Sequence, residues 1–104
     1  MADKAPRPPL FAPPRTFIAV RPNRGILTRR TVEQTRWGIT YGSSVIVSVF
    51  GLTSVEAGVG ELIGRILADG GAAHVEFQAT GSPGVLADLR ATVERAAADY
   101  WAAT

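Results

Sequence analysis

The sequence predicts an α+β fold, a two-layer sandwich in which two helices cover one face of a mixed sheet of about four strands. Three observations predict it. Residues 43–50 and 73–80 have the apolar patterns of strands, residues 53–69 and 83–101 have apolar side chains at helical spacing, and five of the first 14 residues are proline. The expected element order is β-β-β-α-β-α, after an extended N-terminal arm.

The arm is the stretch MADKAPRPPLFAPP over residues 1–14. Proline fixes φ and has no backbone donor, so this stretch can form neither a helix nor an inner strand. We expect an extended, polyproline-like segment in which Leu10 and Phe11 are candidate anchors for a groove on a neighbouring chain. Residues 15–104 have the length of a single domain with one core.

Two strands are expected early in that domain. Residues 15–21, RTFIAVR, predict the first because their apolar side chains favour β structure, and Pro22 ends it. Residues 26–41 contain several β-branched side chains before Gly38 and predict the second, with a short helix over residues 29–36 as the alternative. We expect these strands to add antiparallel pairs to the sheet.

Residues 43–50, SSVIVSVF, are the clearest strand. Three valines share one face of it, and Ile46, Ser48 and Phe50 share the other. One face is therefore wholly apolar and the other partly so. This pattern predicts a central strand that is fully covered on one side and partly covered on the other.

Residues 53–69 predict the first helix. Thr53 and Glu56 form a capping-box pattern at its start, and Gly70-Gly71 ends it. Six apolar side chains fall on one stripe, namely Val55, Val59, Leu62, Ile63, Ile66 and Leu67. The strand–helix–strand unit over residues 43–80 should be a right-handed crossover that joins two parallel strands.

The last strand and helix follow the same logic. Residues 73–80 alternate, so that Val75, Phe77 and Ala79 face the core while polar side chains face out. Ser82-Pro83 places a capping residue before a proline at the first helical position, which predicts a helix over residues 83–101.

Charge is distributed unevenly along a chain of net charge +2. Residues 1–50 carry eight positive and two negative side chains, whereas residues 51–104 carry three positive and seven negative ones. This asymmetry predicts a basic surface that meets an acidic partner, either a nucleic acid or the acidic half of a neighbouring copy.

No catalytic residue, metal ligand or cofactor is predicted. The chain has no cysteine, which excludes disulfides, thiolate metal sites and cysteine nucleophiles. His74 is the only histidine, and with Glu76 nearby on the same strand face it offers too few ligands for zinc, which usually takes three or four from the protein. We therefore interpret His74 as a surface side chain.

The glycines in the first helix predict close packing. Gly58, Gly60 and Gly64 are spaced one residue too widely for a dinucleotide-binding loop, and they lie within the expected helix. Each interior glycine costs about 1 kcal/mol relative to alanine. Because Gly60, Gly64 and Ala68 recur every four residues, we expect another backbone to approach there, from the second helix or from another subunit.

Two further groups are candidates for contact with partners. Residues 21–36 contain the arginines Arg21, Arg24, Arg29, Arg30 and Arg36, and Trp37 and Tyr41 follow them. Arginine suits phosphates and aromatic rings can stack on bases, although no helix-turn-helix, RRM or zinc-finger pattern accompanies them. Near the C-terminus, Trp101 either caps the core or, if it faces water, anchors an interface.

The expected function is that of a non-enzymatic structural or assembly subunit, a homo-oligomer that uses its arm and its complementary charged faces. A small phage virion component, such as a head–tail connector or tail protein, is one concrete form. The alternatives are a nucleic-acid-binding module that uses residues 21–36, a small regulatory protein that binds a protein partner, and a small enzyme or ligand-binding protein with a pocket at His74 or Tyr41.

The cell compartment is expected to be the cytoplasm or the interior of a protein assembly. The longest apolar run is far shorter than the roughly 20 residues of a membrane span, and the N-terminus lacks the apolar core of a signal peptide. We expect no membrane partner and no small-molecule substrate.

Overall fold

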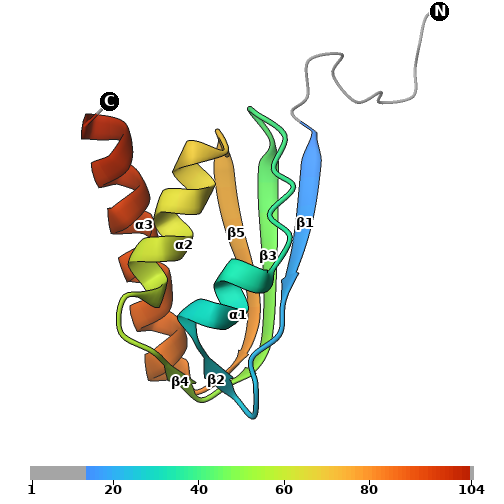
Figure 1. The fold of residues 1–104 in the computed structure, drawn as a ribbon, viewed down its shortest axis with the longest axis vertical. Coiled ribbons are helices and arrows are strands. Elements are labelled where there is room, and N and C mark those ends of the chain that lie inside the picture. The colour runs from blue at the N-terminus through green and yellow to red at the C-terminus, as the bar shows by residue number, and fades with distance from the viewer. Residues whose placement is uncertain (1–13, 104) are drawn as a thin grey trace, which may run out of the picture.

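A computed structural model describes residues 14–103 (Figure 1). Its main sheet contains the strands β1 (Arg15–Val20), β3 (Ser44–Leu52) and β5 (His74–Gly81), all parallel and in the order β1-β3-β5. A short parallel pair joins β2 (Ile26–Leu27) to β4 (Ser54–Val55). The helices are α1 (Arg29–Gln34), α2 (Val59–Asp69) and α3 (Pro83–Ala103).

All three helices lie on one face of the main sheet (Figure 1). The sheet grows in one direction, from β1 to β3 to β5, and consecutive parallel strands are joined by crossovers that contain a helix. Because such crossovers almost always have the same hand, both place their helices on the same side. The helix α3 extends this layer beyond β5 and packs mainly against α2.

The core between the sheet and the helices is aliphatic. Its buried side chains are valine, leucine, isoleucine and alanine, and no aromatic ring of residues 14–103 is among them. Val45, Val47 and Val49 of β3 are completely buried. The one buried polar residue in this part of the chain is Ser43, whose Oγ accepts a hydrogen bond from the Thr16 hydroxyl at 3.1 Å.

The predicted α+β class is confirmed. Strands were expected over residues 43–50 and 73–80 and lie at 44–52 and 74–81, and the helix expected over residues 83–101 spans 83–103. Gly70 ends α2 as predicted. The arm lies outside the described residues except for Pro14, whose carbonyl oxygen accepts a hydrogen bond from the Ser44 N–H at 2.8 Å.

The expected mixed sheet of about four strands is wrong, because β1 pairs with β3 in parallel and the main sheet has three strands. Adjacent parallel strands need a crossover between them, usually a helix. The strand favoured over residues 26–41 is accordingly reduced to β2, and the alternative short helix is present as α1. Thr28 caps α1 by accepting a hydrogen bond from the Thr31 N–H, and Val32 is buried beneath it.

The predicted start at Thr53 of the helix expected over residues 53–69 is also wrong. Residues 53–56 run alongside residues 25–29 instead, and the Thr53 hydroxyl donates to the Gly25 carbonyl oxygen at 3.2 Å. The Glu56 carboxylate, expected in a capping box with Thr53, accepts a hydrogen bond from the Arg29 N–H at 2.8 Å. The helix α2 therefore begins at Val59, after Gly58 in the left-handed region at φ 86°.

Gly60 and Gly64 of α2, here called the glycine ridge, face α3. Of the two neighbours expected there, the other helix and another subunit, the structure shows the other helix. A Cβ on Gly60 would lie 2.6 Å from Thr92 Cγ2, and one on Gly64 would lie 2.6 Å from the Val93 carbonyl oxygen. The absence of side chains at Gly60 and Gly64 thus lets two helices of one protomer touch. None of the described helices is long and apolar enough to cross a membrane.

Candidate functional site

Within residues 14–103, the second face of the main sheet is open. Side chains alternate along each strand, so those that point away from the helices lie on this face: Arg15, Phe17 and Ala19 from β1, Ser44, Ile46, Ser48 and Phe50 from β3, and His74, Glu76, Gln78 and Thr80 from β5. No helix of the described chain covers them (Figure 1). We refer to this surface as the bare face.

The bare face carries exposed aromatic side chains. Phe17 is 67% exposed and Phe50 is 59% exposed, and Ile46, which lies beside Phe17 on the neighbouring strand β3, is half-buried. Sheets that are entirely parallel occur almost only where both faces are covered, and an exposed apolar cluster marks a contact surface. The sequence predicts partial cover for one face of β3. It does not predict that Phe17 of β1 lies on this same uncovered face, because that depends on which side of the sheet the helices occupy.

The arginines of residues 21–36 are all exposed on the β1–α1 side of the molecule. Arg21 and Arg36 line one shallow groove of about 360 Å³ together with Ala19 and residues of α1. Arg29 and Arg30 begin α1, and Arg24 occupies the preceding turn at φ 52°.

Of the two aromatic residues that follow these arginines in the sequence, only one is exposed. The Trp37 indole N–H donates to the Val32 carbonyl oxygen at 2.8 Å, and the ring is partly buried against the core. Tyr41 is 86% exposed. Its ring lies beside Gly71, in a groove shared with Asp69 and Tyr100, so the structure does not bring it together with the arginines.

The charge asymmetry along the sequence becomes an asymmetry in space. Residues 14–43, which build β1 and α1 at one edge of the sheet, carry six arginines and one acid. Residues 56–103, which build α2, β5 and α3 towards the other edge, carry three arginines and seven acids. Opposite edges of one protomer are thus basic and acidic.

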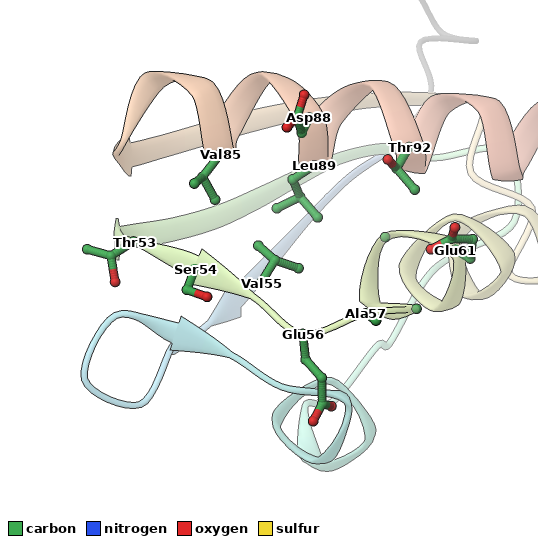
Figure 2. Close-up of a pocket in the computed structure, with 12 residues that line it drawn as sticks. Thr53, Ser54, Val55, Glu56, Ala57, Glu61, Val85, Asp88, Leu89 and Thr92 are labelled. Atoms are coloured by element: carbon green, nitrogen blue, oxygen red, sulfur yellow. The ribbon is translucent and has the colours of Figure 1, made fainter.

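A groove of about 390 Å³ lies beyond the carboxyl ends of β3 and β5, between the segment 53–58 and α3 (Figure 2). Ligands of parallel α/β sheets usually bind at such ends. Val55, Val85 and Leu89 point towards one another across the groove, whereas the Glu56 side chain turns away towards α1 (Figure 2). The residues that line it include hydroxyls and carboxylates but no histidine, lysine or arginine.

The end of α3 packs against the end of α2. The Tyr100 hydroxyl donates to Asp69 Oδ1 at 2.7 Å, and this hydrogen bond, with some desolvation and the negative charge of Asp69, raises the pKa of Tyr100 above 10.0. The Trp101 indole N–H donates to the Ala68 carbonyl oxygen at 3.4 Å while the residue stays 47% exposed. Trp101 therefore packs against the end of α2, as expected of a residue that caps the core, and it is also exposed to water, as expected of an interface anchor.

The other candidates from the sequence are distributed over the molecule. Gly60 and Gly64 are buried under α3, and Leu10 and Phe11 lie outside the described residues. His74 and Tyr41 are both exposed, so neither lies in a buried polar pocket. Between residues 14 and 103 no cluster of three histidine, aspartate or glutamate side chains could hold a metal ion.

Comparison of the chain with protein-family models, with curated proteins and with solved structures gave no match.

Proposed function

We propose that this protein is a non-enzymatic, homo-oligomeric subunit of a protein assembly. The observation that supports this function is the bare face: residues 14–103 cover the parallel sheet on one side only, and Phe17 and Phe50 are exposed on the other. Covering that face with protein would remove apolar surface from water and give the sheet the two-sided burial that parallel sheets normally have. A small virion component remains one concrete form of this proposal.

The charged edges support self-association as well. A neighbouring copy offers an acidic α3 edge to the basic β1 edge, and β1 has no strand partner on its outer side within the described chain. Unpaired edge strands and opposite charges both favour association. Contacts of this head-to-tail kind generate rings or filaments.

The molecular mass in solution tests the proposal. We expect light scattering coupled to size-exclusion chromatography to give a mass above the 11.0 kDa of the monomer, and a mass that rises with protein concentration. A variant that lacks residues 1–13 should associate more weakly if the arm contributes. A strictly monomeric protein at millimolar concentration, with no change on deletion of the arm, would overturn the proposed function.

A nucleic-acid-binding module is the second candidate, and the six arginines with one acid on the β1–α1 side favour it. Binding that rests on phosphate contacts weakens steeply with salt. Filter binding of a single-stranded oligonucleotide at several salt concentrations would measure this slope. The double variant Arg21→Gln/Arg36→Gln should flatten it, whereas the control Arg90→Gln on α3 should not; absence of binding at low salt excludes this candidate.

A further inference from the structure

From the pattern of side chains on the bare face, we infer that two copies of this chain pack there sheet against sheet. The twofold axis that relates them lies in the plane between the two sheets and runs perpendicular to the strands. This inference rests on the proposed function, because it names the contact through which the protein associates with itself. The partner is a second copy of the same chain, and the contact is isologous, so each pair of contacting residues occurs twice, once in each direction.

Large and small side chains alternate along β3 of the bare face, and on β1 the small Ala19 follows the large Phe17. The parallel register aligns Phe17 with Ile46 and Glu76 in one row across the sheet, here called the Phe17 row. The next row, called the Ala19 row, contains Ala19, Ser48 and Gln78. On β3 the same alternation continues, with Ser44 before the Phe17 row and Phe50 after the Ala19 row.

A twofold axis midway between these two rows brings large side chains opposite small ones. It places Phe17 over the partner's Ala19 and Ile46 over the partner's Ser48. It also places Phe50 over the partner's Ser44. Two packed sheets lie about 10 Å apart and interdigitate when large and small residues face each other. At these positions of β1 and β3 the bare face is therefore complementary in shape to a copy of itself.

The polar side chains of β5 distinguish this axis from the other twofold arrangement. The proposed axis sets Glu76 over the partner's Gln78, whose amide can donate to the carboxylate; within one chain these two side chains already lie 3.5 Å apart. An axis parallel to the strands would instead set Phe17 over the partner's Glu76. That arrangement would cover a carboxylate with an apolar ring, which is unfavourable without a hydrogen-bond donor.

The size of the bare face predicts a weak contact. Three strands about 4.8 Å apart, with side chains over seven residues of β3, present a projected area of about 350 Å². Stable interfaces bury about 800 Å² on each partner. We therefore expect dimerisation that depends on concentration in the micromolar range or above, which contacts between the charged edges can extend into a larger assembly.

Exchanging a large and a small side chain tests the axis directly. The variant Phe17→Ala empties a position in both protomers, and Ala19→Phe sets two rings opposite each other. We expect each single variant to raise the dimer dissociation constant, by about 100-fold for Phe17→Ala and at least about tenfold for Ala19→Phe. The double variant Phe17→Ala/Ala19→Phe restores a large residue opposite a small one and should return within about threefold of the wild type.

Sedimentation equilibrium over a wide concentration range measures these constants, and far-UV circular dichroism checks that each variant is folded. Positions 17 and 19 are exposed, so the substitutions should leave the core intact. The matched control is Tyr41→Ala, which removes an exposed aromatic ring outside the bare face and should leave the constant unchanged.

The outcomes separate this inference from the proposed function. A wild type that stays monomeric refutes both. A wild type that associates, with single variants that have no effect or a double variant that is no better than Phe17→Ala, refutes the proposed axis and leaves self-association standing. Loss of oligonucleotide binding in Phe17→Ala, with association unchanged, would show that bases rather than a second copy occupy the bare face.

Discussion

The contact between α2 and α3 depends on the absence of a side chain at Gly64, and Gly64→Ala is the sharpest test of it. An added Cβ would lie 2.6 Å from the Val93 carbonyl oxygen, 2.7 Å from the Ala96 Cβ and 3.0 Å from the Ala97 nitrogen. Two of these atoms belong to the backbone and the third is bonded to it, so none can rotate away. Since an ordinary contact is about 3.5–4.0 Å, α3 would have to move by about 1 Å.

Two opposing effects set the size of the change. Overpacking of a core typically costs 1–3 kcal/mol, and three rigid contacts place Gly64→Ala near the upper value of about 3 kcal/mol. Replacing glycine by alanine inside a helix returns about 1 kcal/mol. The free energy of unfolding should therefore fall by about 2 kcal/mol, which corresponds to a decrease in Tm of roughly 10 °C for a domain of this size.

Gly84→Ala is the matched control, because a Cβ on Gly84 in the first turn of α3 would meet nothing within 4 Å. The same chemical change should leave stability unchanged or raise it by up to about 1 kcal/mol. Urea denaturation followed by far-UV circular dichroism at one protein concentration compares the two. A Gly64→Ala variant as stable as the wild type would show that the helices do not pack as described.

Three further substitutions probe other elements. Thr28→Ala removes the cap of α1 and should cost about 1 kcal/mol, visible as faster amide exchange in that helix; unchanged exchange would contradict the cap. Asp69→Ala removes the acceptor and should return the pKa of Tyr100 towards 10.0, which phenolate absorbance follows during a pH titration, and an unmoved pKa would exclude the hydrogen bond. In the wild type, the folded pKa of Tyr100 is raised, so the stability that this hydrogen bond contributes is complete below pH 10.0 and disappears as the pH rises through the folded value. Gly81→Ala adds a Cβ where the Leu52 backbone passes, at φ 141°, and should cost about 3 kcal/mol or more; a native Tm would refute that close approach.

The elements that could be predicted from the sequence are those with a strong period. The alternation in β5, the valines of β3 and the stripe on α3 each specify an element type and a buried face without reference to the rest of the chain. The glycine ridge likewise predicted a close approach, and α3 provides it.

The elements that were mispredicted depend on contacts between distant segments. Local patterns favoured a strand around Val32 and a helix start at Thr53, yet residues 25–29 and 53–56 hydrogen-bond to each other and leave α1 and α2 to begin later. The bare face could not be derived either. It exists because two crossovers lie on the same side of the sheet, and no local pattern around Phe17 carries that information.

The aliphatic core has a practical consequence for spectroscopy. Both tryptophans of the chain, Trp37 and Trp101, lie outside the fully buried core and keep some contact with water. Their emission should therefore shift little in wavelength when the protein unfolds. Trp101, at the end of α3, is better suited to report the binding of other molecules at the surface than to report unfolding. Quenching of its fluorescence would detect binding that does not change the fold.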